Sequence, residues 1–457
     1  MKPKKLKIYF IGIGGIGVSA LAQYYLEKGH RVSGSDLVSS EITNSFKKLG
    51  VKIFIGKHKK ENLPPNVDLV VFSPAVQKDN PEFKASKKLQ TTNSQLQILS
   101  YPEALGDLTK QYFTIAVSGT HGKSTTTAMI GLLLVKAGLD PSVIVGTKVK
   151  EFGPSTGGSN YRVGKSKYLV IESCEHEESF LNYSPDIIVI TNIEPDHLDY
   201  YKNFKNYKKA FIKFTQKLKK NGIVITEKEY KNSKDAEKLK KILKVPGEHN
   251  VFNALAALAV ARTLKIPDKI SFKVLSEYRG SWRRFEITKI LNPKPYTLIN
   301  DYGHHPTEIK TTLKAAREKY PKKKIWCIFQ PHQYHRTYRL FDDFVRAFRQ
   351  AQDKFFIDKL IITDIYSVPG REKEYLKKKV SSQKLVKAIK KRNVIYLPTQ
   401  ASERSVVSKR DEVSLRKENI LNYLKDNLQG GEVVIIMGAG DIYEMSRQFR
   451  NVIARAK

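Results

Sequence analysis

The sequence predicts an α/β protein with three domains, each built on a sheet of mainly parallel strands. Its length of 457 residues fits about three domains of ordinary size. Short apolar runs alternate with helical segments along the chain, which favours parallel strands joined by helices. Two glycine turns each lie between such a strand and a helix. With 40% hydrophobic and 10% aromatic residues, the chain can also build globular cores.

The first domain, residues 1–108, begins with a nucleotide-binding pattern. Lys7–Ile11 has the composition of a buried strand, and a helix follows it to about Glu27. A second strand, Arg31–Ser35, ends at Asp36, about 20 residues beyond the glycines that open the helix. These glycines are Gly12, Gly14, Gly15 and Gly17. Because glycines allow close approach of a diphosphate and an acid suits a ribose hydroxyl, we expect a Rossmann-like domain for NAD or another nucleotide diphosphate.

Two further strands, Val51–Ile55 and Asp68–Ser73, should extend the first sheet. Ser73 opens the loop S-P-A at the carboxyl end of the second of them, which is where parallel sheets bind ligands. Ser73 is therefore a candidate ligand-binding residue. The first domain boundary is expected near residue 108.

The central domain, residues 109–280, contains a phosphate-binding turn. The strand Tyr112–Ala116 leads into V-S-G-T-H-G-K-S-T, and an apolar helix follows. The loop residues are Gly119, Thr120, His121 and Gly122. Backbone N–H groups and the helix start favour phosphate, Lys123 adds a cation, and Ser124 or Thr125 offers a hydroxyl to Mg²⁺. Val117 takes the place of the first glycine of G-x-x-x-x-G-K-[ST], so G-T-x-G-K-[ST] describes the turn better. The expected ligand is ATP or GTP.

Two later strands of the central domain end in polar groups. Tyr168–Ile171 runs into Glu172, and Ile187–Ile190 runs into T-N-I-E-P-D-H, which ends at His197. A carboxylate at this edge of a parallel sheet can hold Mg²⁺ that bridges ATP phosphates. His197 is a less usual ligand, because magnesium prefers oxygen, and a capping or hydrogen-bonding role is equally open.

A third segment of the central domain carries two side-chain amides. Pro246–Asn253 should lead into a helix, Ala254–Leu264, and the spacing of Asn250 and Asn253 places them on one helix face. Amides there can read a purine or tie the helix start to the phosphate loop, and simple N-capping is the alternative.

The third domain, residues 281–457, should again alternate strands and helices. Four of its strands run into polar loops that belong on one edge of a sheet: Thr297–Ile299, Ile325–Phe329, Lys359–Thr363 and Glu432–Met437. The first loop reads N-D-Y-G-H-H-P-T-E and contains Asp301, His304 and His305. The second reads Q-P-H-Q-Y-H-R and ends at Arg336. The paired histidines before a proline mark a specific site.

The composition limits the classes of function. The net charge of +36 would attract nucleic acid, but the lysines are scattered and no nucleic-acid-binding signature is present, so we expect solvated helix faces. Two cysteines without a C-x-x-C or Cys/His cluster argue against a disulfide framework or zinc site. The basic, apolar opening imitates a signal peptide, but its spaced glycines fit a nucleotide site better. No apolar run approaches a membrane span. We expect a cytoplasmic protein.

Six motifs together resemble the Mur ligases of peptidoglycan synthesis, over nearly the whole chain and in order. They are G-x-G-G-x-G from Gly12, G-T-H-G-K from Gly119, T-N-I-x-x-D-H from Thr191, H-N-x-x-N-A from His249, R-R-F from Arg283 and D-Y-G-H-H-P-T-E from Asp301. The last two are far more specific than a glycine loop. The resemblance is strongest to the members that join L-alanine to UDP-N-acetylmuramate while ATP is cleaved to ADP and phosphate.

This resemblance implies a role for each candidate residue. It implies that Lys123 holds the β- and γ-phosphates, and that Mg²⁺ lies among Ser124 or Thr125, Glu172 and His197. Asn250 and Asn253 would serve the ATP site. In the third domain Arg284 and Asp301 would bring the domain to the reaction, His304 and His305 would orient the amine or the phosphate, and Arg336 would grip the amino acid's carboxylate. The glycines at 12, 14, 15 and 17, with Asp36 and Ser73, would hold the UDP-sugar. The implied partners are these substrates, with no nucleic acid, and the expected state is a monomer or dimer.

Departures from the family pattern bear on the amine donor. Gln333 stands where relatives usually carry a second arginine, and the segment from Glu172, E-S-C-E-H-E-E-S-F, differs from the usual E-S-D-E-S-D-A-S-F. The first alternative is therefore the sister ligase that recycles a murein tripeptide. From other classes, a nicotinamide dehydrogenase would leave the ATP turn unused, and a nucleic-acid-binding ATPase would explain only the charge.

Overall fold

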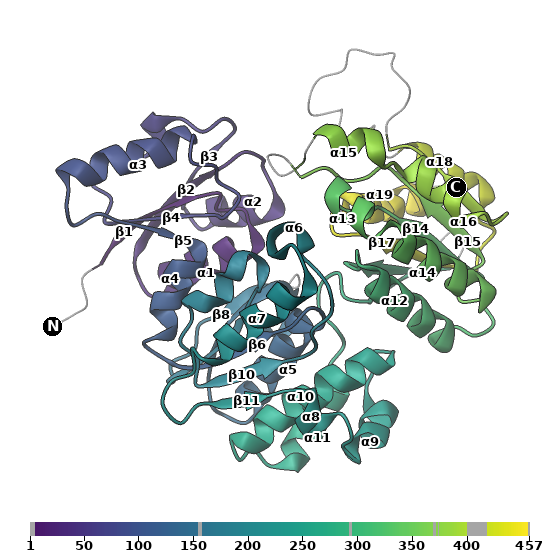
Figure 1. The fold of residues 1–457 in the computed structure, drawn as a ribbon, viewed down its shortest axis with the longest axis horizontal. Coiled ribbons are helices and arrows are strands. Elements are labelled where there is room, and N and C mark those ends of the chain that lie inside the picture. The colour runs from purple at the N-terminus through teal and green to yellow at the C-terminus, as the bar shows by residue number, and fades with distance from the viewer. Residues whose placement is uncertain are drawn as a thin grey trace. The chain divides into compact units, whose positions relative to one another are not determined.

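The computed structural model describes residues 5–153, 158–291, 295–368, 372, 374–399 and 418–455, whose strands form three β-sheets flanked by helices (Figure 1). The chain divides into two compact units. The first comprises Met1–Leu243 and Val251–Tyr278, and the second comprises Lys244–Asn250 and Arg279–Lys457. The first unit contains two of the sheets and the second unit contains the third.

The first sheet has the strand order β3-β2-β1-β4-β5, with every recorded pairing parallel, and it confirms the predicted Rossmann-like arrangement. Its strands are β1 (Lys7–Ile11), β2 (Arg31–Asp36), β3 (Lys52–Ile55), β4 (Leu69–Phe72) and β5 (Gln97–Ser100). Its helices are α1 (Ile16–Glu27), α2 (Glu41–Lys48), the short 3₁₀ helix η1 (Lys60–Asn62), α3 (Pro81–Thr92) and α4 (Tyr101–Thr109).

The second sheet has the order β11-β10-β6-β9-β7-β8, with β6 between the two strands that the sequence predicts to end in site residues. Its strands are β6 (Phe113–Ser118), β7 (Ser142–Val149), β8 (Ser159–Arg162), β9 (Tyr168–Glu172), β10 (Ile187–Ile190) and β11 (Ile223–Ile225). Only β8 is antiparallel to its neighbour in this described sheet. Apolar side chains on both faces of β6 are buried, as a central parallel strand requires.

The helices of the second sheet include α5 (Lys123–Lys136), which is buried from Ser124 to Leu134. The others are η2 (Lys150–Phe152), η3 (His176–Asn182), α6 (Leu198–Tyr201), α7 (Phe204–Thr215), α8 (Glu227–Tyr230), α9 (Asp235–Ile242), α10 (Glu248–Thr263) and α11 (Asp268–Glu277). Helix α1 of the first sheet packs against β7 and β8, so one apolar core runs through both sheets of this unit.

The third sheet has the order β12-β13-β17-β14-β15-β16, and the four strands predicted to carry polar loops are its adjacent parallel strands β13, β17, β14 and β15. Its strands are β12 (Glu286–Ile290), β13 (Tyr296–Asp301), β14 (Ile325–Phe329), β15 (Lys359–Ile362), β16 (Val394–Tyr396) and β17 (Val433–Met437). Its helices are α12 (Pro306–Lys319), α13 (Tyr334–Arg339), α14 (Phe341–Asp353), α15 (Glu374–Lys379), α16 (Ser382–Ile389), α18 (Glu418–Asn427) and α19 (Ile442–Arg455).

Several predicted element boundaries differ from the structure, and two of these differences involve buried candidate residues. The helix expected from Ala254 begins at Glu248, so Asn250 and Asn253 lie within its first turns rather than ahead of it. Strand β13 extends to Asp301, because Asn300 and Asp301 keep parallel pairing with β17, and both residues are buried rather than in a loop. Polar residues in both extensions interrupt the pattern of apolar residues, so this pattern did not predict them.

Candidate active site

The central phosphate turn joins β6 to α5, and two of its glycines are required by neighbouring atoms. Gly119 has φ +133°, and a Cβ there would lie 2.1 Å from the hydroxyl of Thr191. Gly122 has φ +82°, and a Cβ there would lie 2.2 Å from Oδ1 of Asn253. Any larger side chain would also be strained by the left-handed backbone. The turn is therefore fitted closely against the loop after β10 and against helix α10.

Asn192, in the loop after β10, holds the phosphate turn by hydrogen bonds. Its Oδ1 accepts from the N–H of His121 at 2.9 Å, and its Nδ2 donates to the His121 carbonyl at 3.0 Å. The N–H of Thr120 donates to the Asn192 carbonyl at 3.0 Å. These two turn N–H groups are therefore engaged within the protein, whereas the first N–H groups of α5 have no intrahelical partners and are suited to phosphate.

Ser124 and Glu172 meet at the start of α5. The Ser124 hydroxyl donates to Oε1 of Glu172 at 3.0 Å, and the N–H of Gly146 on β7 donates to Oε2 at 2.7 Å. Both side chains offer oxygen atoms, which suits a hard cation. Thr125, the other predicted hydroxyl, is buried in the first turn of α5.

Lys123 is paired with a carboxylate that the sequence did not single out. Its Nζ lies 2.9 Å from Oε2 of Glu175, whose side chain is 1% exposed. Burial acts to lower the pKa of the Lys123 ammonium, but the adjacent Glu175 carboxylate outweighs it, and the pKa stands above its ordinary value. Lys123 therefore stays charged at neutral pH.

His197 is the N-cap residue that precedes α6 and has a left-handed backbone, φ +52°. Its Nε2 lies 3.8 Å from Glu175 and 3.7 Å from Asp196, and its ring packs edge-on against His176 at 4.5 Å between centroids. The His197 ring therefore lies beside two carboxylates, and its side chain makes no cap hydrogen bond to α6.

The two asparagines of α10 have different contacts. Asn253 Oδ1 accepts from the Thr126 hydroxyl at 3.3 Å and lies beside Gly122, so it ties α10 to the phosphate turn. Asn250 Nδ2 donates to the carbonyl of Pro246 at 2.7 Å, which is a local contact at the helix start. Of the roles considered for the pair, tying the helix to the phosphate turn fits the contact of Asn253 with Thr126.

The glycine turn of the first sheet is also constrained by its neighbours. Gly12 has φ +80°, and its N–H donates to the Ser35 carbonyl at 2.9 Å. A Cβ at Gly14 would lie 2.8 Å from the Asp36 carboxylate, and one at Gly17 would lie 2.9 Å from the Tyr101 side chain. Gly15 is the N-cap residue of α1. The spacing of these glycines thus follows from the contacts of the turn.

Asp36 holds the turn itself. Its Oδ2 accepts from the N–H of Gly14 at 2.8 Å, and its Oδ1 accepts from the N–H of Val38 at 3.2 Å. After β4, which β1 separates from β2 in the sheet, the Ser73 hydroxyl accepts from the N–H of Ala75 at 3.3 Å. Both predicted substrate-binding side chains therefore stabilise loops at the carboxyl edge of this sheet.

Behind the turn, Ser35 is fixed by a buried carboxylate. Glu82 on α3 is fully buried and accepts from the Ser35 hydroxyl and from Asn62 Nδ2, the latter at 2.7 Å. His58 Nδ1 lies 3.1 Å from the same carboxylate. Although burial acts to raise the pKa of Glu82, these hydrogen bonds hold it below its ordinary value. The cluster ties α3 and η1 to the strand that carries the turn.

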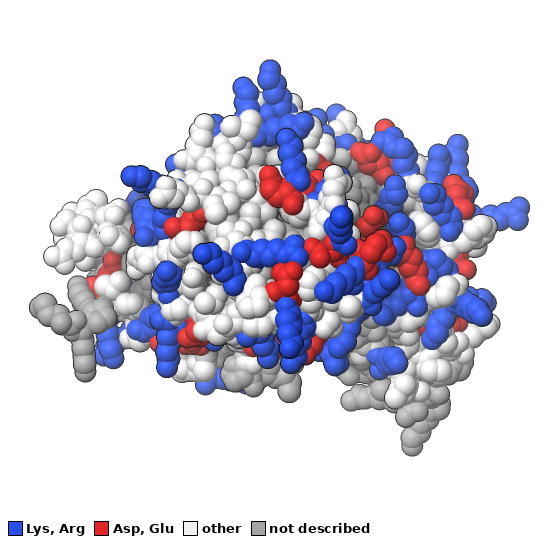
Figure 2. Space-filling model, turned by 90° about the horizontal axis from the view of Figure 1, so that it is seen from below, with Lys and Arg blue, Asp and Glu red and all other residues white. Residues whose placement is uncertain are grey.

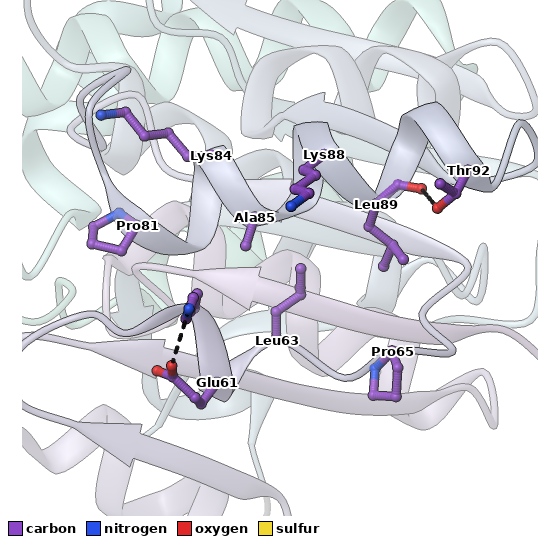
Figure 3. Close-up of a pocket in the computed structure, with 10 residues that line it drawn as sticks. Glu61, Leu63, Pro65, Pro81, Lys84, Ala85, Lys88, Leu89 and Thr92 are labelled. Atoms are coloured by element: carbon purple, nitrogen blue, oxygen red, sulfur yellow. Dashed lines mark hydrogen bonds and ion pairs between the residues drawn. The ribbon is translucent and has the colours of Figure 1, made fainter.

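A pocket of about 650 Å³ lies between η1 and α3, outside the candidate active site (Figure 3). Figure 3 shows Lys84, Ala85 and Lys88 along one side of it, with Leu63 and Pro65 opposite. None of the sequence-predicted site residues lines it.

In the second unit the two arginines of R-R-F have different positions. The Arg283 guanidinium is buried and donates to the carbonyls of Gly438 and Gly440, the latter at 3.1 Å. Arg284 is less buried: its guanidinium stacks 4.9 Å from the centre of the Tyr302 ring. Arg283 thus links the R-R-F turn to the loop after β17, and Arg284 Nη1 lies 3.8 Å from Oε1 of Glu308.

Asp301 organises the loop that follows β13. Its carboxylate accepts from the N–H groups of Phe285 and Gly303, both at 2.8 Å, and from the Thr312 hydroxyl at 3.3 Å. Burial raises the pKa of this carboxyl, and the nearby Arg284 opposes the rise. The described contacts make Asp301 an anchor for the R-R-F turn.

The paired histidines of this loop also differ in their contacts. His305 is the N-cap residue of α12: its Nδ1 accepts from the N–H of Thr307 at 3.3 Å, and Glu308 completes a capping box. His304 Nδ1 lies 3.1 Å from the Tyr302 carbonyl and 3.3 Å from Glu308. The two neighbouring histidines therefore have different contacts.

Arg336 lies at the start of α13 beside the residue that departs from the family pattern. Its Nη1 lies 3.3 Å from Nδ1 of His332 and 3.4 Å from Oε1 of Gln333. The His332 ring stacks on Tyr366, with 5.5 Å between centroids and planes 9° apart. Gln333 itself has φ +67°, and its N–H donates to the Tyr366 carbonyl at 2.9 Å. Stacking and hydrogen bonds thus fix this group.

The basic residues are spread over the surface. Figure 2 shows Lys and Arg side chains scattered across the face drawn, with acidic side chains among them. This agrees with the predicted solvated faces. Among the described residues, no helix combines the length and apolar character needed to cross a bilayer.

Several residues that shape the site were missed from the sequence. Thr191 and Asn192 belong to a motif we recognised, but only the contact with the phosphate turn reveals what they do. Glu175 lies in the segment noted as unusual, and its pairing with Lys123 spans 52 residues. Tyr207, which donates to Glu175 at 3.2 Å, had no signal beyond its aromatic character.

Three family models match the chain in succession. The Mur ligase family catalytic domain matches residues 7–113, the Mur ligase middle domain matches residues 117–243, and the Mur ligase glutamate ligase domain matches residues 283–440.

Relatives match over nearly the whole length. UDP-N-acetylmuramate–L-alanine ligases of Clostridium tetani and Acetivibrio thermocellus are 40% and 38% identical, and the alignments cover 97% and 98% of this chain and 97% of each relative. The crystal structure of UDP-N-acetylmuramate-alanine ligase MurC from Thermotoga maritima has a TM-score of 0.76 at 28% identity, covering 99% of this chain and all of that one. A murein peptide ligase from Psychrobacter arcticus, at 21% identity and a TM-score of 0.65, shares the fold. The chain belongs to the Mur ligase family.

Proposed function

We propose that the chain is an ATP-dependent ligase that joins L-alanine to UDP-N-acetylmuramate in peptidoglycan precursor synthesis. The observation that carries the proposal is the phosphate turn, where Lys123, Ser124 and Glu172 gather at the start of α5. The substrates in this proposal are those in the names of the relatives, which match nearly the whole chain. Because ATP and UDP-linked precursors are found in the cytoplasm, we expect the reaction there. We expect the protein to be a monomer or dimer.

The chemistry explains why ATP is needed. A carboxylate is a poor acyl donor at neutral pH, so its oxygen first attacks the γ-phosphate, which gives an acyl phosphate and ADP. The amine nitrogen of the amino acid then attacks the acyl carbon through a tetrahedral intermediate, phosphate leaves, and the amine loses a proton. Phosphoryl transfer of this kind depends mainly on positioning and on neutralising charge.

The central domain supplies that positioning. We assign Lys123 to the β- and γ-phosphates and the first N–H groups of α5 to phosphate oxygens. Ser124 and Glu172 offer the oxygen donors that Mg²⁺ prefers, and Mg²⁺ held there would offset phosphate charge. For His197 we prefer the hydrogen-bonding role, because its ring lies against two carboxylates.

The other two domains would bind the substrates to be joined. We assign the UDP-sugar to the glycine turn of residues 1–108, the nucleotide to residues 109–280, and the amino acid to residues 281–457. In the last of these, Arg336 would pair with the amino acid's carboxylate, and Arg284 and His304 would contact the reacting groups. Asp301 and His305 would act by holding their loop.

Phosphate release tests the proposal. With ATP, Mg²⁺ and UDP-N-acetylmuramate we expect turnover with L-alanine, checked by product mass, against glycine, L-serine and the tripeptide L-Ala-D-Glu-diaminopimelate. Turnover with the tripeptide alone would assign the protein to the recycling reaction instead. Lys123→Ala should retain UDP-sugar binding and lose about a hundredfold or more in rate. Substantial retained turnover would show that the phosphate turn is misassigned.

A further inference from the structure

The Lys123 ammonium is fully engaged without any nucleotide. It donates to the carbonyls of Gly119 at 2.6 Å and Thr120 at 3.1 Å, and its third contact is the Glu175 carboxylate, at 2.9 and 3.1 Å from the two oxygens. An ammonium has three N–H donors, so these contacts use them all. To reach a phosphate oxygen, Lys123 must release at least one of these partners.

Glu175 is held in place independently of Lys123. The Tyr207 hydroxyl donates to its Oε1 at 3.2 Å, and the Tyr201 hydroxyl donates to its backbone carbonyl. Its side chain is 1% exposed, so the carboxylate cannot turn out into water when the ammonium moves. Burial raises the pKa of the Glu175 carboxyl, and Lys123 opposes that rise. The only lysine ammonium recorded beside this carboxylate among the described residues is that of Lys123.

We propose that Glu175 competes with the nucleotide's phosphates for Lys123 and thereby weakens nucleotide binding and favours ADP release. The proposal rests on the proposed function in one respect, that Lys123 receives phosphate. Withdrawing Lys123 takes the ammonium away from a buried carboxylate that then keeps the more distant His197 Nε2, at 3.8 Å, as a basic neighbour, and losing one partner of a buried ion pair is strongly destabilising. The same carboxylate also repels the incoming phosphates. Both effects oppose nucleotide binding in the wild-type protein.

Glu175 is thus a positioning residue that acts through Lys123. If Glu175 had only a structural role, its loss would loosen the phosphate turn and weaken nucleotide binding, which is the opposite change in affinity. The direction of the change in affinity therefore separates the two.

The test is a calorimetric titration of the full-length protein with MgADP and with a non-hydrolysable ATP analogue. We expect Glu175→Gln to bind both about tenfold more tightly than wild type. Glu175→Asp, whose side chain is one methylene shorter, should have nucleotide affinities between those of wild type and Glu175→Gln. The ATP KM should fall in the same order while the KM for the amine donor stays unchanged. The nucleotide-free melting temperature should drop in Glu175→Gln, and the rise caused by MgADP should become larger.

Glu178→Gln is the matched control. Glu178 lies in the same η3 segment, but its recorded ion pair is with Lys213, at 3.0 Å, and this pair is partly exposed. Its loss should leave nucleotide affinity as in wild type. If wild type fails to bind MgADP, the proposed function fails. If wild type binds but Glu175→Gln and Glu175→Asp bind no more tightly, the competition proposal alone is overturned.

Discussion

Asn192 and His121 are joined by two antiparallel hydrogen bonds, side-chain amide to backbone, at 2.9 and 3.0 Å. Asn192 lies two residues beyond β10, which pairs with β6, so the loop after the neighbouring strand supports the phosphate turn. These hydrogen bonds engage the N–H groups of Thr120 and His121, while the first N–H groups of α5 have no intrahelical partners.

We expect Asn192→Ala to weaken MgADP binding by about 1–3 kcal/mol, because two hydrogen bonds that shape the turn are lost. Calorimetric titration measures this change. Asn182→Ala removes an exposed amide that donates to the Ser179 carbonyl at 2.9 Å, and it should bind MgADP as wild type does. Equal MgADP affinities for the two variants would show that the hydrogen bonds between Asn192 and His121 do not shape the nucleotide site.

Gly122→Ala should abolish nucleotide binding, since its Cβ would lie 2.2 Å from Asn253 Oδ1. Gly138→Ala separates this clash from backbone strain: Gly138 also has a left-handed backbone, φ +77°, but nothing lies within 4 Å of the added Cβ. The control should lose about 1–2 kcal/mol of stability and keep its nucleotide affinity. Nucleotide titration and urea unfolding of both variants check the prediction, which is wrong if the two behave alike.

Glu82→Gln should lower the free energy of unfolding at neutral pH by about 1–3 kcal/mol, because a buried acceptor of several hydrogen bonds is altered. The folded-state pKa of Glu82 is depressed below its ordinary 4.5. The ionised carboxyl therefore adds stability above pH 4.5 that is lost as the pH falls through the folded-state value. Wild type should lose stability more steeply below pH 4.5 than the variant. Urea unfolding from pH 7 to pH 3 measures both curves, and parallel curves would contradict the assignment.

Arg336→Lys should raise the KM for the amine donor about tenfold or more, because lysine cannot form a bidentate pair with a carboxylate. The ATP KM should stay unchanged. Arg339→Lys, on the exposed face of the same helix α13, keeps both constants at wild-type values. Steady-state phosphate release gives the constants, and an unchanged amine KM in Arg336→Lys would place the amino acid's carboxylate elsewhere.

The fold was largely predictable because its signals are local. Strand β1 has the predicted bounds and helix α1 ends at Glu27 as predicted, since the apolar pattern and the glycine turn act within a few residues. The antiparallel strands β8 and β12 were not anticipated, because short half-polar segments carry no comparable pattern. The polar ends of β13 and α10 were missed for the same reason.

By itself the sequence determined which residues stand at strand ends and helix starts, and so which groups could meet a nucleotide. The tertiary structure decided which of them are free to do so. It shows the carboxylates of Asp36 and Asp301 engaged with backbone N–H groups, and Lys123 paired with Glu175. The physical reason is that hydrogen bonds and ion pairs form between groups brought together across long stretches of chain, and neither composition nor spacing records which pairs meet.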